Sequence, residues 1–488
     1  MRRNMRLKRL AAIALIIPMA AFALEFPIHK EVLDNGLTVL LYPSSQAPTV
    51  SCRLFYVTGS VNEVPGSSGL AHILEHELFK GTKTVGVTDF EKDSVLMAKE
   101  DSVMALSRAA ALSGDSALAK KFRAEYDSLV EVERKFMVKE ELWGAYQQAG
   151  GTGLNAFTTD LMTAYIVTLP KNRIELFLYL EADRMQNAVL REFYSERDVV
   201  REERRMRYDD RPTGRYFETL NGLIYEAFPY RVPTIGWPSD IMNLTREQAA
   251  EHYRKYYKPR NAILVLAGDL DTAKTMDLVK KYFAKIPPGE SFAPITVRDP
   301  EQVGEKRLKV FRPDAPNRLD FVFKTPAIGD SSLYALDIAE GVLNGRSGRL
   351  YKKLVEEKKF AVSVRAGNSV NKYVSEFSVS AVLRPEANPD SVEAVIWEEL
   401  ERLKKEPVSP RELQKVKNRS VMALVESFQD MENVATQLAW YEMFGDYRLL
   451  LNWPSELEKV SADAVQRAAG KFLCRKNATV GLLLKGEN

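Results

Sequence analysis

The sequence predicts an α+β fold made of two halves, and three observations lead to this expectation. Segments rich in β-branched and aromatic residues alternate with segments of helical apolar spacing. The stretch 287–294 (PPGESFAP) contains prolines and a glycine, which disfavour both helix and sheet interior. The alternation then begins again, and 488 residues suffice for two sizeable cores. We therefore expect an N-terminal domain over residues 24–286 and a C-terminal domain of the same type over 295–488.

The first residues have the features of a secretory signal peptide. Five cationic residues precede a short apolar stretch at 10–20, and Ala21-Phe22-Ala23 forms an A-x-A cleavage site. The apolar stretch is too short to span a bilayer comfortably. We expect residues 1–23 to be removed and the mature chain to reach a bacterial periplasm. An uncleaved segment would instead associate the chain with a membrane.

The elements of the first half follow in order. Strands are predicted at 36–44 and 49–60, and PGSSG at 65–69 marks the start of a helix that Ser67 or Ser68 can cap. Residues 88–149 are dense in Ala, Leu, Glu and Lys, which predicts two long charged helices joined by a turn at 113–116. This insertion is either a solvated hairpin or an arm for a partner. The remaining elements are expected as strands at 150–170 and 261–271, and helices at 174–190, 193–210 and 272–286.

The second half repeats this mixture of elements. A strand is expected at 317–326, helices at 331–343 and 348–360, and strands at 361–369 and 373–383. A net charge of +3 gives no sign of a nucleic-acid binder. The two cysteines, Cys52 and Cys474, have neither zinc-finger spacing nor a disulfide framework, although one long-range bridge stays open.

The stretch 69–82 (GLAHILEHELFKGT) contains two of the four histidines. His72 and His76 are four residues apart, so on a helix they point the same way, and Glu75 shares their face. Two imidazoles and a carboxylate suit zinc. The order H-x-x-E-H is the inverted form of the zinc-protease motif, in which the glutamate takes a proton from a water molecule at the ion. The alternative is two surface histidines bridged by a glutamate.

A catalytic zinc needs a third protein ligand. His29 lies before the first strand and His252 lies in a later helix, so neither fits well. Glu196 and Glu203 are seven residues apart on one predicted helix and share a face. One could bind the ion while the other orients a ligating imidazole. Spacing does not choose between them, and either could be a solvated helix charge.

Five segments together resemble one family of peptidases. HILEH with LFKGT, GGTGLNAFT, ERDVVREERR with DDRPTG, and YYKPRNAILVLAGDLD occur in the order typical of the pitrilysin/insulysin zinc metallopeptidases, on the mitochondrial-processing-peptidase side of that family. The resemblance covers nearly the whole mature chain. It implies endopeptidase activity on peptides or unfolded segments. It also implies two similar halves, each an antiparallel sheet with helices, that together form half of a clam-shell.

The resemblance also assigns roles to residues. It implies that His72 and His76 bind one zinc ion per chain and that Glu75 is the base. The family pattern E-R-x-x-V-x-x-E matches 196–203, which makes Glu203 the third ligand and Glu196 the carboxylate behind an imidazole. Glu203 follows His76 by 127 residues, about 50 more than the family spacing, and the surplus matches the insertion.

The same resemblance implies which residues bind the substrate and that the chain needs a partner. LNAFTTD resembles the strand edge that pairs with a peptide, so Asn155 and Ala156 are expected to bind substrate; a strand-end turn residue is the alternative for Asn155. A complete site in the family also needs an arginine and a tyrosine from a second half, where this chain has Val355 and Val362. We therefore expect a heterodimer with a related non-catalytic chain. The alternative function is a non-catalytic assembly protein on the same fold.

Overall fold

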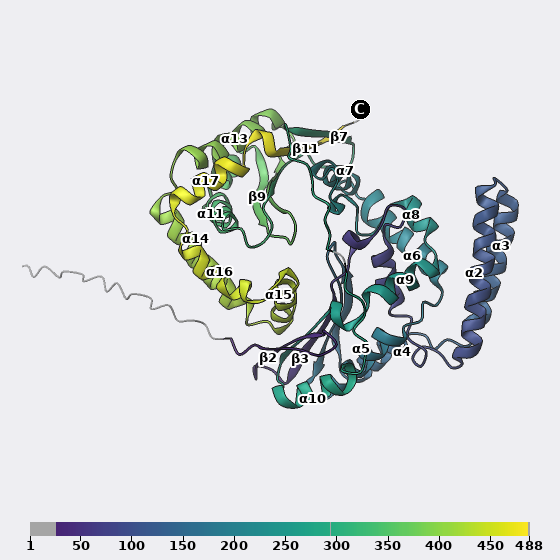
Figure 1. Cartoon of the computed structure of the whole chain (residues 1–488). Coiled ribbons are helices and arrows are strands. Elements are labelled where there is room, and N and C mark those ends of the chain that lie inside the picture. The colour runs from purple at the N-terminus through teal and green to yellow at the C-terminus, as the bar shows by residue number, and fades with distance from the viewer. Residues whose placement is uncertain (1–25, 293, 487–488) are drawn as a thin grey trace, which may run out of the picture.

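The chain forms two lobes that face each other, as Figure 1 shows. The computed structural model describes residues 26–292 and 294–486. The signal peptide predicted at residues 1–23 lies outside the described residues. Each lobe is built on one sheet with helices, which confirms the predicted two-part α+β fold.

The sheet of the first lobe has six strands in the order β1-β2-β6-β3-β5-β4. Its members are β1 (His29–Val32), β2 (Thr38–Pro43), β3 (Thr49–Tyr56), β4 (Thr152–Thr158), β5 (Thr163–Pro170) and β6 (Ala262–Gly268). Strand β2 pairs with β6 in parallel, while the other pairs are antiparallel. The sheet is therefore mixed rather than antiparallel throughout. Strand β4 lies at one edge.

The sheet of the second lobe has five strands in the order β7-β11-β8-β10-β9. They are β7 (Lys306–Arg312), β8 (Arg318–Thr325), β9 (Ala361–Ser369), β10 (Ser375–Leu383) and β11 (Ala478–Lys485). Here β7 and β11 are the parallel pair. Each lobe thus combines antiparallel neighbours with one parallel pair between segments that are far apart in the sequence.

The helices fall into the same two groups. The first lobe contains α1 (Leu70–Glu77), α2 (Phe90–Leu112), α3 (Ser116–Glu133), α4 (Glu141–Gln148), α5 (Ile174–Asn187), α6 (Phe193–Arg204), α7 (Gly214–Ile224), α8 (Pro238–Asn243), α9 (Arg246–Tyr256) and α10 (Thr272–Phe283). The second contains α11 (Ser332–Leu343), α12 (Arg349–Tyr351), α13 (Pro389–Lys405), α14 (Pro410–Ser427), α15 (Met431–Phe444), α16 (Arg448–Glu458) and α17 (Ala462–Phe472). The two long helices of the insertion are α2 and α3, which stand at the outer edge of the first lobe in Figure 1.

Each sheet has one face on helices of its own lobe and the other on a helix of the opposite lobe. In the first sheet, Leu264 and Leu266 point into the core shared with α5 and α10, whereas Val265 points to the opposite side. That side is covered by α15, which comes from the second lobe. In return, α7 of the first lobe packs on β11, where a Cβ at Gly481 would lie 2.3 Å from Tyr216 Oη. Strand β6 is therefore buried on both faces and is apolar along its length. In the second sheet α7 packs on β7 and β11, while β9 keeps exposed residues.

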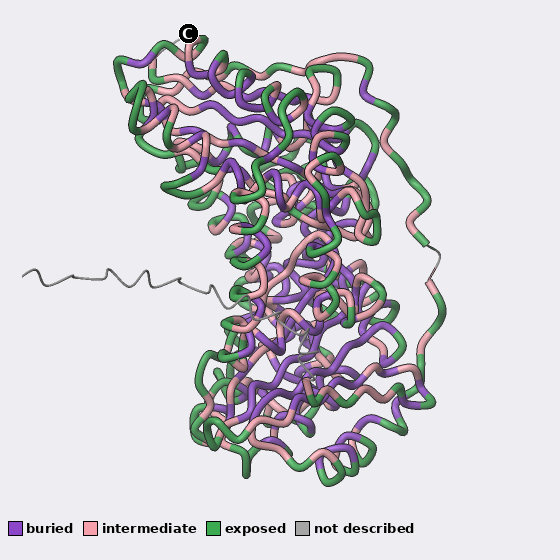
Figure 2. The backbone as a smooth tube through the Cα atoms, turned by 90° about the vertical axis from the view of Figure 1, so that its left-hand side faces the viewer, coloured by how far each residue is buried: buried purple, intermediate pink, exposed green. Residues whose placement is uncertain are grey.

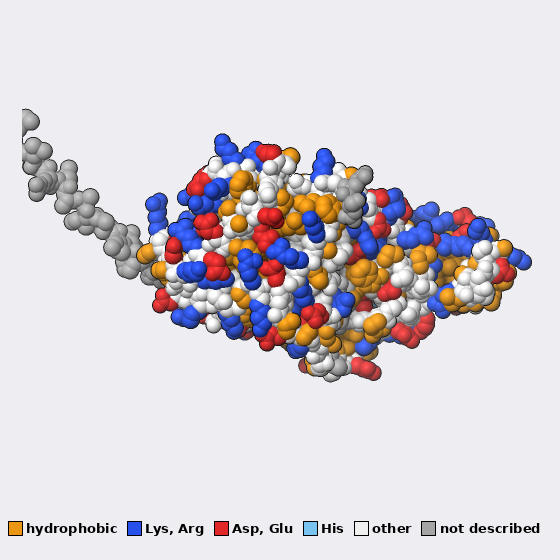
Figure 3. Space-filling model, turned by 90° about the horizontal axis from the view of Figure 1, so that it is seen from above, with side chains coloured by type: hydrophobic (Ala, Val, Ile, Leu, Met, Phe, Trp, Pro, Cys, Tyr) orange, Lys and Arg blue, Asp and Glu red, His pale blue; other side chains and the backbone are white. Residues whose placement is uncertain are grey.

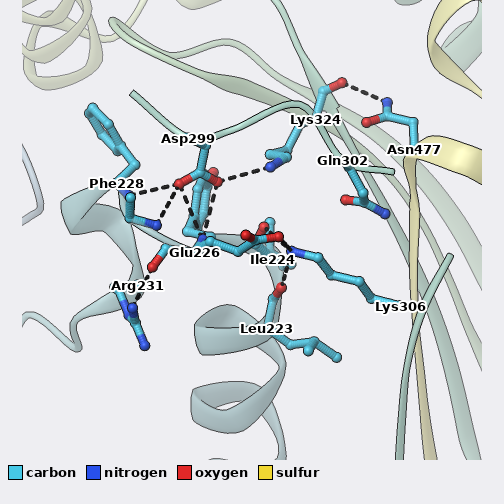
Figure 4. A network of polar contacts seen from close by, with 12 residues as sticks. Leu223, Ile224, Glu226, Phe228, Arg231, Asp299, Gln302, Lys306, Lys324 and Asn477 are labelled. Carbon is cyan, nitrogen blue, oxygen red and sulfur yellow. Dashed lines mark hydrogen bonds and ion pairs between the residues drawn. The ribbon is translucent and has the colours of Figure 1, made fainter. Parts of the chain in front are cut away.

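The connection between the lobes runs along the outside of the molecule, as Figure 2 shows. No helix or strand is present between α10 and β7 in the described residues 284–292 and 294–305. Asp299 ties this connection to both lobes (Figure 4): its Oδ1 accepts the backbone N–H groups of Ala227 and Phe228 at 2.8 and 2.7 Å, and its Oδ2 accepts from Lys324 Nζ at 2.9 Å. The boundaries expected at 286 and 295 stay a prediction. No helix in the described part of the chain has the length and apolar composition to cross a bilayer.

Candidate metal centre

Helix α1, which carries the H-x-x-E-H residues, starts from an unusual turn. Gly69 at its N-terminus has φ 88°, and a Cβ there would lie 2.6 Å from the carbonyl oxygen of Ile235. Only glycine combines that dihedral with so close an approach. The cap predicted at Ser67 or Ser68 is wrong. Glu63 takes that role, because its carboxylate accepts the N–H groups of Gly69 and Ala71 at 3.0 and 2.8 Å.

Three side chains converge beside this helix. Glu203 of α6 places its Oε2 at 3.4 Å from His76 Nε2 and 3.8 Å from His72 Nε2. The ligand atoms of all three residues lie within 4.8 Å of one another, and no other such cluster of three His, Cys, Asp or Glu side chains occurs in residues 26–292 and 294–486. Two ligands held about 2.0–2.1 Å from a tetrahedral ion are roughly 3.3 Å apart. The 3.4 Å separation matches this value and the 3.8 Å separation is slightly wider, so a small adjustment of these side chains would hold a zinc-sized ion.

Two features of these side chains also fit a metal. Glu203 Oε2 is buried and has no hydrogen-bond donor among the described residues, although it faces both imidazoles. A buried carboxylate oxygen without a hydrogen-bond donor destabilises the fold unless a cation binds to it. Burial, helped by the neighbouring His76, lowers the pKa of His72 to about 4. His72 is therefore neutral at physiological pH, as a metal ligand must be.

Glu196 holds the other face of His76. Its Oε1 lies 3.0 Å from His76 Nδ1, and its Oε2 accepts from Lys80 Nζ at 2.6 Å. Burial alone would raise the pKa of Glu196, but the contacts with His76 and Lys80 outweigh burial and lower it to about 2. For His76, burial acts to lower the pKa, whereas the hydrogen bond to Glu196 and the nearby carboxylate of Glu203 raise it to about 10. A carboxylate at Nδ1 leaves Nε2 for the metal and fixes the ring.

Glu75 lies on the same helix and is nearly buried, with 8% of its surface exposed. Its Oε2 accepts a hydrogen bond from Thr158 Oγ1 at 2.6 Å. Burial raises the pKa of Glu75, and the Thr158 hydroxyl acts against that rise. A carboxylate with a raised pKa that still has one fixed hydrogen bond suits a general base.

The predicted substrate residues lie on the neighbouring strand. Asn155 is exposed and Ala156 is buried, and both belong to β4, the edge strand of the sheet that runs past α1. The outer edge of β4 is not paired with another strand in the described chain. Val355 lies in the second lobe just before β9, and Val362 is exposed within β9. The substrate-binding roles of Asn155 and Ala156 stay predictions, and so does the need for a partner chain that was inferred from Val355 and Val362.

Two polar residues at this site were not singled out by sequence reasoning. Thr158 and Lys80 both lie within conspicuous stretches, LNAFTTD and LFKGT. Their contacts join β4 to α1 and the turn after α1 to α6, and the partners are 83 and 116 residues apart along the chain. No local spacing signals a contact of that kind.

Comparison with known proteins finds two family models that match this chain. Residues 38–100 match the model of the insulinase family (peptidase family M16), and residues 243–420 match the model of the peptidase M16 inactive domain. The first match contains the two histidines, and the second lies mostly in the lobe that holds no metal-ligand cluster in its described residues. The predicted resemblance to this family is confirmed.

Relatives and solved structures give the same result. The chain is 27% identical to the zinc protease PqqE of Helicobacter pylori, over 94% of this chain and 93% of that protein. The crystal structure of a protease from Helicobacter pylori superposes with a TM-score of 0.78 and 25% identity, over 94% of this chain and all of that one. The periplasmic protease PqqL of Escherichia coli has a TM-score of 0.72 and 16% identity, but this chain covers only 48% of it.

Proposed function

This chain belongs to peptidase family M16, and we propose that it is an exported zinc endopeptidase that hydrolyses peptides or unfolded protein segments. The observation that carries the proposal is the convergence of His72, His76 and Glu203, with Glu75 held beside them by Thr158. Zinc, when bound, would polarise the scissile carbonyl and make water more acidic. Support also comes from the relatives named as zinc proteases.

The residues of this chain then have distinct tasks. His72, His76 and Glu203 hold the ion, and Glu196 fixes the His76 ring through Nδ1. Glu75 takes a proton from the attacking water and later returns it to the leaving amine. The hydroxyl of Thr158 keeps one oxygen of Glu75 in place during both transfers.

The substrate is proposed to lie along β4. A peptide that adds to this open edge gains backbone hydrogen bonds whatever its sequence. Asn155 is exposed on that strand and can hold a substrate carbonyl, while Ala156 packs inward. This mode of binding suits unfolded chains, because a folded protein has few free strands to offer.

Full activity is proposed to require a second, related chain that is not catalytic. This chain has Val355 and Val362 where the family places an arginine and a tyrosine, and valine donates no hydrogen bond to a developing oxyanion. The PqqL chain is about twice as long, which is consistent with a second half supplied in one chain there and by a partner here. Export rests on residues 1–23, and the periplasmic location of PqqL supports it.

The substitution Glu75→Gln tests the catalytic role. We expect the variant to retain the zinc content of the parent and to lose cleavage of a quenched fluorescent peptide, assayed with the co-purified partner present. Asn155→Ala is the companion variant and should raise KM more than it lowers kcat. Equal cleavage by Glu75→Gln and the parent would refute the proposal and favour a non-catalytic assembly protein.

A further inference from the structure

A groove separates the helical hairpin from the body of the first lobe. Its volume is about 630 Å³, within the range of roughly 300–1,000 Å³ typical of small-molecule sites. Figure 3 shows hydrophobic side chains, among basic ones, where the projecting hairpin meets the body. We call this feature the hairpin groove; it is lined by Asp101, Met104, Ala105, Ser107, Arg108, Ala111, Arg123, Tyr194, Arg197, Met242, Asn243, Leu244, Thr245 and Glu247.

The walls of the hairpin groove are mainly apolar. Met104 and Ala105 come from α2, and Met242 comes from the end of α8. The groove exists because the insertion stands beside the body, so it is a feature of the inserted segment and not of the metal centre. An apolar groove of this size gains stability when a hydrocarbon chain replaces water.

Arg197 brings a buried positive charge into this groove. Only 6% of its surface is exposed, and its Nη1 donates to the carbonyl oxygen of Leu244 at 3.1 Å. Its guanidinium lies over the ring of Tyr194, 5.2 Å from the centroid. Its Nε–H meets no acceptor, and no carboxylate is within ion-pair distance of Arg197 in the described part of the chain. A buried cation without an anion is costly, so a ligand anion would be favoured here.

The other charged residues of the groove are already engaged or are basic. Asp101 accepts from Tyr194 Oη at 2.9 Å and pairs with Arg246 at 3.3 Å. Glu247 pairs with Arg254 at 2.6 Å. Among the described residues, Arg108 donates only to the carbonyl oxygen of Asn243, at 3.3 Å.

Arg123 is the third arginine, and it pairs with Asp198 at 2.8 Å. Within the described residues, Arg108 and Arg197 thus face the groove without a carboxylate partner. The groove offers two guanidinium groups at an apolar wall.

We propose that the hairpin groove binds an aliphatic monocarboxylate, a free fatty acid with its carboxylate at Arg197 and Arg108 and its chain against Met104, Ala105 and Met242. A guanidinium binds a carboxylate through two parallel hydrogen bonds, which matches the free donors here. The acids Asp101 and Glu247 disfavour a multiply charged anion such as a nucleic acid. This inference does not depend on the proposed peptidase activity.

The test is a calorimetric titration of decanoate, below its micelle concentration, into the full chain. Decanol has the same chain without the charge, and decyltrimethylammonium has the opposite charge. We expect saturable 1:1 binding of decanoate, at least tenfold tighter than decanol, and no binding of the cation. Equal affinity for decanoate and decanol would overturn the proposal.

Variants locate the binding. Arg108→Ala and Arg197→Gln should each weaken decanoate binding at least tenfold. Because Arg197 is buried and its replacement can disturb folding, Ala105→Trp, which fills the groove from an exposed helix position, gives a second test. Ala124→Trp is the matched control on the exposed side of α3, outside the groove. Unchanged decanoate binding in Ala105→Trp would refute the site. Binding of a hexaglutamate peptide without any binding of decanoate would also refute it and would indicate a protein partner instead.

Discussion

Replacing Glu133 by glutamine should stabilise the protein at neutral and alkaline pH. Glu133 ends α3 at the root of the hairpin, is fully buried, and neither of its oxygens meets a hydrogen-bond donor in the described residues. Two further carboxyls face it: Asp93 pairs with Arg191 at 2.9 Å and Glu100 pairs with Arg246 at 2.6 Å. Three carboxyls thus share two arginines. Burial, together with the charges of Glu100 and Asp93, raises the pKa of Glu133 from 4.5 to about 9.

The sign of the effect follows from proton counting. Between pH 4.5 and 9 the folded chain holds a proton on Glu133 that the unfolded chain has released. The free energy of unfolding therefore falls as pH rises through this window, by about 1.4 kcal/mol per unit for one such group. The loss is about 3 kcal/mol between pH 5 and 7. Glutamine keeps the shape, donates an N–H to a neighbouring carboxylate and does not titrate, so Glu133→Gln should lack this loss.

Urea unfolding at pH 5, 7 and 8 measures the difference. Parent and Glu133→Gln should have similar stability at pH 5, and the variant should be about 4 kcal/mol more stable at pH 8. Glu131→Gln is the control, because Glu131 lies on the same helix but is exposed and pairs with Arg134 at 2.6 Å. Parallel pH profiles for parent and Glu133→Gln would refute the reasoning, and so would an equal gain in the control.

Two further predictions concern the metal centre. Thr158→Val removes the hydroxyl that lowers the pKa of Glu75, so the acid limb of the kcat/KM profile should move to higher pH with zinc content unchanged. The control is Thr168→Val, which removes a hydrogen bond of 2.7 Å to Glu432. An acid limb that Thr158→Val does not move would contradict the role of Thr158. Because the pKa of His76 is raised to about 10, zinc must displace a proton from it at neutral pH, and zinc affinity should fall about tenfold for each unit that pH is lowered from 9 to 6. Calorimetry in two buffers of different ionisation enthalpy should then give release of about one proton, and none released would disprove it.

Local spacing predicted each of the two residue pairs at the candidate metal centre, whereas the choice of Glu203 as the third ligand came from the family resemblance. Four residues on a helix fix the common face of His72 and His76, and seven fix that of Glu196 and Glu203. Sequence spacing alone did not rank the two glutamates. The structure shows why both are present: they contact opposite nitrogens of the same His76 ring, with Glu196 at Nδ1 and Glu203 at Nε2.

The helix cap at α1 could not be predicted, although capping is usually a local matter. Ser67 and Ser68 are ordinary capping residues in the right place, yet Ser68 Oγ donates to Asp240 at 2.6 Å instead. The positive φ of Gly69 turns the chain so that the first N–H groups point back to Glu63. Tertiary packing against Ile235 imposes that turn, and a pattern of five residues does not contain it.

The packing of the two lobes against each other could not be predicted from the sequence either. This packing explains why the second lobe matters to a site that lies in the first lobe. The apolar run in β6 indicates a strand buried on both faces, but it does not say which helix covers the second face. The structure places α15 there, with Glu432 at its start within 3.4 Å of the buried guanidinium of Arg53 on β3. Arg53 has no other carboxylate partner among the described residues. Removing the second lobe would therefore leave the Arg53 guanidinium without an ion pair on an uncovered face of the sheet. Since β3 pairs with β5, and β5 pairs with the β4 strand that carries Thr158, the second lobe supports the strand that positions Glu75 although it supplies no ligand to the cluster.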